Sequence, residues 1–503
     1  MIALDIPYLL LQTIVVPLIS ALIVALVGKK LGRHVGWISG ASLVYTSILL
    51  ILAGVKLYST GRPILETYTW SPIINIEFGF LADGLSLPVA FIMNLVCAAC
   101  AFYSIHYIEH RIEVEYGEDR PALHAVYHAI YLLFSVGLVG ISLSTNLIEL
   151  YLFVELCLIP SYLMIDLFGY IDRERIAFMY FIWNHVGASI FFIGIILAFL
   201  VTGSFLITDL SKLNGNPLAF WVCFTILVGW LIKMATFGFH VWLPYAHGEH
   251  PTSIAAIIAT IVGLGNYVIV RLLVQELFES FQPFGFPLMV LALITMVYGA
   301  LLTIAQDDIK RLYACSTISQ TAYSLLGIGS MTLLGVTGGV FYFLSHSIGK
   351  CILFSVAGIV LAQTGLRDMR KMGGLASRMP ITAILAITGS MILSAIPPLS
   401  GFPAELIMFT GIFVQGTLGD LTKLIVVVIG IFATFLTTIY TFWPVRRVFF
   451  GPLPENLKDV KEAPPSMTVP LLILVLASFI LGVYPNVFMQ FFNSYANLLP
   501  LSR

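Results

Sequence analysis

Long apolar stretches, separated by short polar segments, recur along the whole sequence. Most hold about 20 residues, the length that an α-helix needs to cross the hydrocarbon core of a bilayer. This length favours helices over the short alternating strands of a membrane β-barrel. The pattern predicts fourteen spans, at residues 7–27, 35–54, 85–105, 126–144, 147–167, 177–201, 218–239, 252–273, 286–305, 312–329, 334–363, 381–417, 424–445 and 467–486.

Helix breakers interrupt two of these spans. Span seven runs into the segment Gly238 to Pro244, and span twelve contains the segment Ile396 to Pro403. A broken helix frees backbone groups that must be satisfied inside the protein, so it typically lines a cavity or an ion path. The two breaks lie five spans apart, as in an inverted five-helix repeat. The predicted fold is therefore an all-α integral membrane protein of about 14 transmembrane helices, with two inverted five-helix repeats and discontinuous helices 7 and 12.

The order of the spans divides the chain into four parts. Between spans two and three, residues 74–80 alternate apolar and polar side chains, which predicts a β-strand of a hairpin outside the membrane. We expect helices 1–3 with this hairpin in residues 1–125, the first repeat (helices 4–8) in 126–275, the second repeat (helices 9–13) in 286–445, and a loop with helix 14 in 446–503.

Composition and charge placement support a membrane location. With 59% hydrophobic and only 10% charged residues, the chain is not a water-soluble globule. Of its 25 Lys and Arg residues, 17 are assigned to loops after odd-numbered spans, Lys310 among them, and 5 to loops after even-numbered spans, Arg271 among them. The positive-inside rule then places the odd-numbered loops in the cytoplasm and both termini outside. We expect a multi-pass protein of the cell inner (cytoplasmic) membrane.

Four ionisable residues, Glu155, Lys233, Lys350 and Glu405, stand inside apolar spans. A charge at the bilayer centre costs roughly 2.5–3.5 kcal/mol on insertion scales, so such residues usually have partners and functions. Lys233 precedes the first break, and Glu405 follows the second. A glutamate facing a lysine is a natural switch, because gain or loss of one proton unbalances the pair. We predict a proton relay; a purely structural ion pair is the alternative for Glu155 and Lys233.

Further polar residues extend this line. His346 precedes Lys350 by four residues, which places both on one helix face. For His346, a hydrogen-bonded core histidine is an alternative interpretation. Asp166 follows Glu155 by eleven residues and returns to nearly the same face. The secondary relay candidates found in this way are Glu149, Asp166 and His185.

The sequence offers no signature of electron-transfer chemistry. Cys97 and Cys100 form a C-x-x-C, but it lies inside a span without a histidine or a second cysteine pair nearby. Small apolar packing residues are the preferred interpretation over a metal or cluster site. Gly-rich phosphate loops, flavin motifs and soluble domains are also lacking. We therefore expect no cofactor, no metal site and no nucleic-acid partner.

Taken together, these residues resemble a known family, the antiporter-like membrane subunits of complex I and related complexes. The resemblance covers nearly the whole chain. Most members carry a lysine after the second break, whereas the NADH-quinone oxidoreductase chain M (chain 4) type carries a glutamate, as Glu405 does here. The motifs that carry the resemblance are Asp83 to Ser86, Phe153 to Pro160, His240 to Pro244 with His247 and Pro251-Thr252, Gln306 to Arg311 followed by Ser316 to Gln320, and Pro397 to Phe402.

The resemblance implies roles for the intramembrane residues. Glu155 with Lys233 corresponds to the coupling pair, His346 with Lys350 to the central relay, and Glu405 to the connection with the next subunit or the exit.

Two further relay candidates come with the resemblance. His240 belongs to the motif of the first broken helix. In span eight the family usually carries a lysine, but the neighbourhood here reads Ile261 to Tyr267 without an ionisable side chain. Water held by Asn266 and the nearby glycine backbone is expected to bridge this gap.

The resemblance implies a proton-translocating membrane-arm subunit of a redox-driven, complex I-like oxidoreductase, coupled to quinone-linked electron transfer in other subunits. NADH, a deazaflavin or ferredoxin would supply the electrons. One alternative is a subunit of a multi-subunit sodium/proton antiporter, against which Glu405 counts. Another is a structural membrane subunit with an interrupted proton path. The expected partners are other membrane-arm subunits, bilayer lipids and protons, with sodium as the alternative ion.

Overall fold

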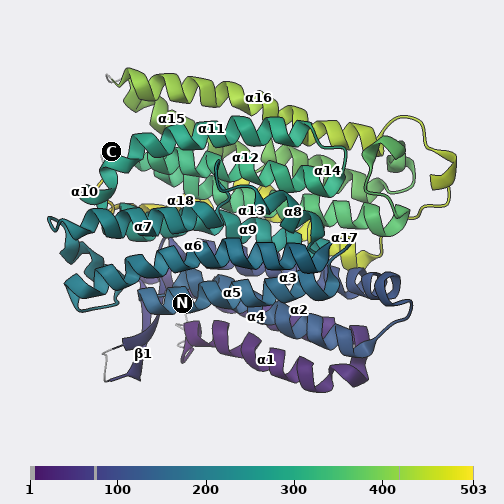
Figure 1. Cartoon of the computed structure of the whole chain (residues 1–503), viewed down its shortest axis with the longest axis horizontal. Helices are drawn as coiled ribbons and strands as arrows, with labels where there is room; N and C mark the ends of the chain where they lie inside the picture. Colours follow the sequence, from purple (N-terminus) through teal and green to yellow (C-terminus); the bar gives the residue numbers. More distant parts are fainter. Residues whose placement is uncertain (1–5, 73–75, 418–419, 502–503) are drawn as a thin grey trace.

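The protein is a bundle of long helices that run side by side along one axis (Figure 1). The structure is a computed structural model and describes residues 6–72, 76–417 and 420–501. Within these residues, ten helical segments are long and apolar enough to cross a membrane, and three shorter apolar helices accompany them. One of the ten combines α1 (Leu9–Leu31) and α2 (Val35–Thr60). The all-α membrane fold is confirmed, whereas the count of fourteen spans stays a prediction.

A two-stranded hairpin joins the second and third helices. β1 (Ile64–Ser71) pairs antiparallel with β2 (Ile76–Ala82), after which α3 (Ser86–Tyr116) begins. The predicted strand at residues 74–80 is confirmed from residue 76 onward, while residues 74 and 75 lie outside the described part of the chain. Figure 1 shows the hairpin and both marked chain ends toward the left-hand end of the bundle.

The middle of the chain forms two repeats with the same order of elements. Each has three long helices, a broken fourth helix and a long fifth helix. Because each repeat makes five passes, the second one starts on the opposite side of the bundle. The first repeat comprises α4 (Pro121–Leu143), α5 (Leu147–Phe168), α6 (Arg173–Thr202), α7 (Leu218–Lys233) with α8 (Trp242–Glu249), and α9 (Thr252–Val268). The second comprises α11 (Gly285–Ile304), α12 (Ile309–Gly329), α13 (Leu333–Thr364), α14 (Pro380–Leu393) with α15 (Gly401–Thr417), and α16 (Leu421–Phe449).

Short elements complete the chain. The π-helical segment η3 (Ile269–Val274) continues α9, and α10 (Phe278–Phe281) leads into the second repeat. After α16 the chain ends in α17 (Pro465–Val483) and α18 (Asn486–Ala496).

Both broken helices end in the same backbone geometry. Ala235 and Ala395 each follow the last helical residue by two positions, and their φ angles are 52° and 51°. The amide after each alanine donates to the carbonyl five residues back, at 3.3 Å in the first break and 3.0 Å in the second. Left-handed alanines cost about 1–2 kcal/mol each, so their recurrence at matching places marks the breaks as equivalent parts of two repeats.

Helix ends elsewhere follow ordinary capping chemistry. The side chains of Asn146, Asp308 and Thr332 accept backbone amide hydrogen bonds at the starts of α5, α12 and α13. Gly203 and Gly365 end α6 and α13 in the left-handed conformation that glycine adopts without a steric cost. Polar residues between the apolar stretches therefore set the helix boundaries.

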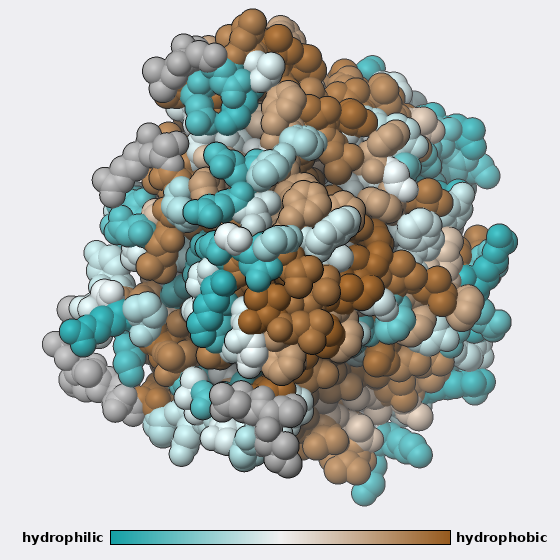
Figure 2. All heavy atoms as spheres, turned by 60° about the vertical axis from the view of Figure 1, so that its left-hand side comes forward, coloured by the Kyte–Doolittle hydropathy of each residue, from teal (hydrophilic) through white to brown (hydrophobic). Residues whose placement is uncertain are grey.

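The core lies along α9 and α13, while the outer helices face the surroundings with apolar side chains. In the most apolar windows of the spans containing α9 and α13, 94% of the residues are buried, against 33% in α6 and α17. Leu26, Leu200 and Phe432 are among many large apolar residues that are more than half exposed. Figure 2 shows apolar side chains over much of one face, with hydrophilic ones among them and at the margins of the view. Such a surface suits lipid or neighbouring membrane helices.

Candidate functional site

Lys233 is the last residue of α7 and borders the first break. Its side chain is buried, with 8% of the residue exposed. Nearby, the freed backbone of the break is satisfied inside the bundle, because the Phe237 amide donates to Thr295 Oγ1 at 3.1 Å and Trp242 Nε1 donates to the Ile232 carbonyl at 3.2 Å. The break thus places a buried amine at the end of α7, before α8 begins.

Glu155 pairs with a histidine in this structure. Its Oε2 lies 3.5 Å from Nδ1 of His185, a residue of α6, and its Oε1 is buried without a hydrogen-bond partner. Among the described residues, none lies in hydrogen-bond or ion-pair distance of Lys233 Nζ, so the expected direct contact between Glu155 and Lys233 is not formed. His185, a secondary candidate from the sequence, is therefore the immediate partner of Glu155.

A small cavity lies beside Lys233. Its volume for a water molecule is about 10 Å³, close to the minimum of roughly 10–15 Å³ that one water needs. Residues of α5, α6, α7, α8 and α9 surround it, and its polar lining includes Tyr180, Asn184 and Lys233. The cavity therefore offers room for a single water next to the buried amine.

Three polar residues form a line on one face of α13. Tyr342, His346 and Lys350 follow one another at intervals of four residues and are at most 1% exposed. Lys350 Nζ donates to the Tyr313 carbonyl at 2.8 Å and to Ser316 Oγ, both on α12. Both ring nitrogens of His346 lack a hydrogen-bond partner. The expected shared face of His346 and Lys350 is present, and it lies in the core.

Glu405 lies near the end of this line, in the first turn and a half of α15. It is 8% exposed, its Oε1 is unpartnered, and its carboxyl group lies beside the hydroxyl of Tyr342. Tyr342 in turn donates to Gln320 Oε1 at 2.6 Å, and Gln320 Nε2 donates to the Tyr440 hydroxyl at 2.6 Å. This hydroxyl–amide network joins α12, α13 and α16. Sequence reasoning missed it, although Gln320 belongs to a motif noted above.

A second group of buried ionisable residues, not among the predicted relay residues, lies where α8 meets α12. Lys310 is fully buried in the first turn of α12, so its placement among loop residues was wrong. Its Nζ donates to the His250 carbonyl at 2.7 Å and lies 3.9 Å from the ring centroid of Tyr170. His247 is also fully buried, its ring nitrogens lack partners, and its ring lies 6.3 Å from that of His250.

The other secondary candidates occupy different surroundings. Glu149 is fully buried in the first turn of α5, where its Oε2 accepts from the Gly79 amide at 3.2 Å, beside the hairpin. Asp166 is half-buried in the last turn of α5. His240 lies within the first break, with Nε2 3.1 Å from the Tyr298 hydroxyl. None of these three contacts the line on α13.

Around Gly263 and Asn266, in predicted span eight, the chain is closely packed. A Cβ atom added to Gly263 would lie 2.6 Å from the Phe343 ring, so any side chain there collides with α13. Asn266 is fully buried, and its Nδ2 donates to the Gly263 carbonyl at 3.0 Å while its Oδ1 stays unpartnered. α9 therefore packs closely against α13 around Gly263.

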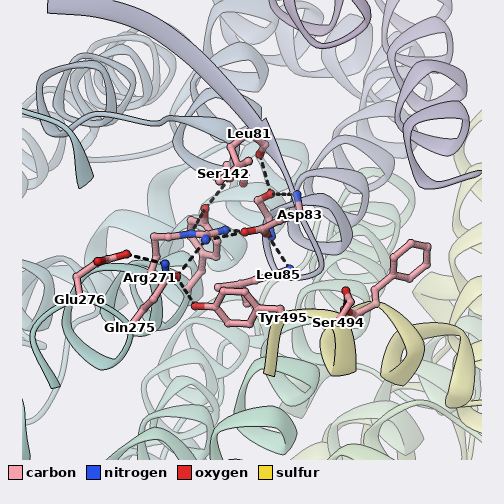
Figure 3. A network of polar contacts seen from close by, with 12 residues as sticks. Leu81, Asp83, Leu85, Ser142, Arg271, Gln275, Glu276, Ser494 and Tyr495 are labelled. Carbon is pink, nitrogen blue, oxygen red and sulfur yellow. Dashed lines mark hydrogen bonds and ion pairs between the residues drawn. The ribbon is translucent and has the colours of Figure 1, made fainter. Parts of the chain in front are cut away.

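A buried ion pair secures the hairpin end of the bundle (Figure 3). Arg271, in η3, binds both carboxylate oxygens of Asp83 at 2.7 and 2.8 Å. Burial raises the pKa of Asp83, but the charge and hydrogen bonds of Arg271 outweigh it and hold that pKa below its ordinary value. Counting Arg271 as a loop residue was wrong. Without Arg271 and Lys310, the loop counts become 16 against 4, and the charge bias remains.

Comparison with known proteins decides the family. Residues 144–437, more than half of the chain, match the family model described as NADH:quinone oxidoreductase/Mrp antiporter, transmembrane. The chain belongs to this family. NAD(P)H-quinone oxidoreductase chain 4 of Gloeobacter violaceus is 30% identical over 484 residues, covering 94% of this chain and 89% of that protein. NADH-quinone oxidoreductase subunit M of Rickettsia prowazekii is 28% identical, covering 97% of this chain and 98% of that protein.

Solved structures show the same family fold. A chain of respiratory complex I from Thermus thermophilus matches with a TM-score of 0.84 and 23% identity, covering 98% of this chain and 99% of that chain. A chain of the Mrp complex from a Dietzia species matches with a TM-score of 0.86 and 21% identity, covering 98% of each. Both structures are multi-subunit membrane complexes, and at these identities the likeness concerns the fold alone.

Proposed function

We propose that the chain is a proton-translocating membrane-arm subunit of a redox-driven complex similar to NADH-quinone oxidoreductase. The observation that carries the proposal is the line of buried ionisable side chains through a fold of this family, from Lys233 beside one helix break to Glu405 beside the other. The names of the curated relatives, chain 4 and subunit M, support a redox-driven complex over an antiporter. Electron transfer in other subunits would supply the energy.

The first repeat would load the proton. Glu155 Oε2 lies 3.5 Å from His185 Nδ1, and the water-sized cavity lies next to Lys233. A proton delivered to Glu155 and His185 makes their surroundings less negative. This change alters how readily the Lys233 amine keeps its own proton. Water in the cavity would carry the transfer that direct contact does not provide.

The second repeat would pass the proton along α13. Lys350, His346 and Tyr342 stand one turn apart, about 6 Å along the helix axis per step, so intervening water is needed between them. His247 lies on the α8 side of this line, with two unpartnered nitrogens and electrostatic contact to Lys350 and His346. We assign to His247 the role of bridging the gap in the relay, which was expected of water held by Asn266. A side chain at Gly263 would collide with the Phe343 ring, so no amine fits there.

The charge bias supports an orientation with both termini outside the cytoplasm, in the cell inner membrane. The hairpin and both chain ends share one end of the bundle, as this orientation requires. The basic residues near Glu249, Asp307 and Asp308 lie at the other end and would face the cytoplasm.

Proton transport and assembly test the proposal together. The complex would be purified from native membranes through a tag on this chain, and its subunits identified by mass spectrometry. Inverted vesicles would report quinone reduction and the accompanying acidification separately. We expect iron–sulfur and quinone-module subunits to co-purify, and Lys350→Gln to lower proton uptake at least about ten-fold.

The matched control is Lys458→Gln, because Lys458 is an exposed loop residue paired with Glu455. Unchanged proton uptake in Lys350→Gln would overturn the relay. Co-purification of small membrane subunits alone, with sodium-dependent exchange, would instead identify a sodium/proton antiporter.

A further inference from the structure

An apolar groove opens on the outer side of α14 and α16, near the end of α16 that follows Pro444. Its volume is about 480 Å³, and it is shallow and open to one side. Side chains from the two helices and the residue after α16 line it. The main lining residues are Ile387, Ile439, Phe442, Trp443, Arg446 and Phe450.

A single cation stands at the rim of this groove. Arg446 is exposed, and its guanidinium lies 5.9 Å from the ring centroid of Trp443. Among the residues that the structure describes, no carboxylate forms an ion pair with it. Its neighbour Arg447 differs, because it binds Asp307 Oδ1 at 3.0 Å. The groove therefore presents a guanidinium with free donors directly above an apolar wall.

The position of the groove along the helix fits the membrane interface. Arg446 lies in the last turn of a 29-residue apolar helix, and Trp443 is 46% exposed beside it. Half-exposed tryptophans and terminal arginines are typical of the headgroup level of a bilayer. Two short 3₁₀ turns, Met369–Lys371 and Leu375–Ser377, pack against α16 at this end. They bring two more exposed cations, Lys371 at the end of the first turn and Arg378 directly after the second. The surroundings are thus positively charged where lipid headgroups lie.

We propose that this groove binds one anionic phospholipid, with its phosphate on Arg446 and an acyl chain along Ile439 and Phe442. Arginine matches phosphate geometry through paired N–H donors, and basic pockets at helix ends attract anionic headgroups. An apolar helix of a neighbouring subunit would cover the wall but leave Arg446 without a negative partner. A zwitterionic lipid would fill the wall equally well, but its own cation would offset the attraction to Arg446.

Photocrosslinking in the intact complex tests this site. The tagged complex would be placed in nanodiscs of phosphatidylcholine with a small fraction of phosphatidylglycerol that carries a diazirine in its acyl chain. Crosslinks would be mapped by mass spectrometry to the peptide that contains residues 438–450. We expect labelling in the wild type and about five-fold less in Arg446→Gln, the factor for roughly 1 kcal/mol per surface cation.

Three comparisons make the result specific. Arg175→Gln removes an 86% exposed arginine far along the chain from the groove and should leave the labelling unchanged. Arg446→Lys keeps the charge and should keep the preference for phosphatidylglycerol. Ile439→Trp fills the wall without changing the charge and should lower the labelling. Equal labelling by a diazirine phosphatidylcholine, an unchanged Arg446→Gln signal, or a wild-type groove shielded by another subunit would each overturn the proposal.

Discussion

At the scale of single residues, Lys233, Lys350 and Glu405 are buried in the bundle and Glu155 is partly buried, but the immediate partners differ from the expectation. Glu155 contacts His185, Lys350 contacts the backbone and a hydroxyl of α12, and Glu405 lies beside Tyr342. Each amine or carboxyl group thus has polar neighbours without a tight ion pair. Loose pairing suits a relay, because a fully satisfied buried salt bridge would hold its proton state fixed.

The close packing at Gly263 can be tested by a substitution that adds one methyl group. We expect Gly263→Ala to destabilise the protein by about 1–3 kcal/mol, because the added methyl group forces the Phe343 ring to move within the core. Thermal unfolding of the purified protein in detergent measures the effect. Gly54→Ala is the matched control, since its Cβ would lie 3.6 Å from the nearest atom, an ordinary contact. Equal unfolding temperatures for the two variants would refute the packing argument.

The buried carboxyl group of Glu276, at the hairpin end of the bundle, should make the stability of the protein depend on pH. Burial raises its pKa from 4.5 to about 7. Between these values the folded protein keeps a proton that the unfolded chain releases, so the free energy of unfolding falls as the pH rises through this window. We expect the unfolding temperature to decrease from pH 5 to pH 8, and Glu276→Gln to reduce that slope. The exposed Glu279→Gln should keep the wild-type slope; a Glu276→Gln slope equal to the wild type would contradict the assignment.

At the scale of elements, the two broken helices and the hairpin determine where the charges lie. The matching left-handed alanines place α7 and α14 in equivalent geometry, while the Asp83–Arg271 pair fixes η3 against the start of α3. Tyr495 of α18 donates to Gln275 at 2.6 Å, so the C-terminal helix also packs onto this pair (Figure 3). Elements from three distant parts of the chain therefore depend on one buried arginine.

Removal of one partner tests this dependence. We expect Asp83→Asn to cost about 3–5 kcal/mol, because it leaves a buried guanidinium without its counter-charge. The side-chain oxygen of the asparagine can still accept hydrogen bonds from the backbone amides of Leu85 and Ser86. The lost stability therefore reports the removal of the negative charge. Chemical unfolding in detergent measures it. The exposed pair of Glu455 and Lys458 provides the control, since Glu455→Gln should cost at most about 1 kcal/mol.

A double variant completes the test. Asp83→Leu combined with Arg271→Met removes both charges, and we expect it to lose less stability than Asp83→Asn alone. A double variant that is less stable than the single one would show that the pair contributes through packing and not through charge.

At the scale of the whole molecule, orientation decides which end takes up protons and which releases them. The six native cysteines are at most 1% exposed, so a single introduced cysteine can be labelled without background. Arg175 and Lys212 have side chains exposed by 86% and 60%, in segments predicted to lie on opposite sides of the membrane.

We expect a membrane-impermeant maleimide to label Arg175→Cys only in inverted vesicles and Lys212→Cys only in right-side-out vesicles, because the positive-inside rule places them on opposite faces. Gel shifts after labelling measure the difference. The unmodified protein should stay unlabelled in both preparations. The reverse pattern would invert the proposed direction of transport.

The sequence by itself determined the membrane class, the two helix breaks, the hairpin and the intramembrane charges, because hydropathy, helix breakers and the cost of a buried charge are local properties of the chain. It also carried the motifs of the family. Even so, residue spacing within one span identifies a helix face without identifying the residue that faces it from another span.

Only the tertiary structure decided the partners. His185 and not Lys233 meets Glu155, Arg271 reaches Asp83 across 188 positions, and Lys310 is buried in α12 and not part of a loop. The Phe343 ring packs against Gly263 of α9, which the order of residues along the chain does not reveal. These contacts join residues far apart in the sequence, and helix packing sets them through the shapes of many side chains at once.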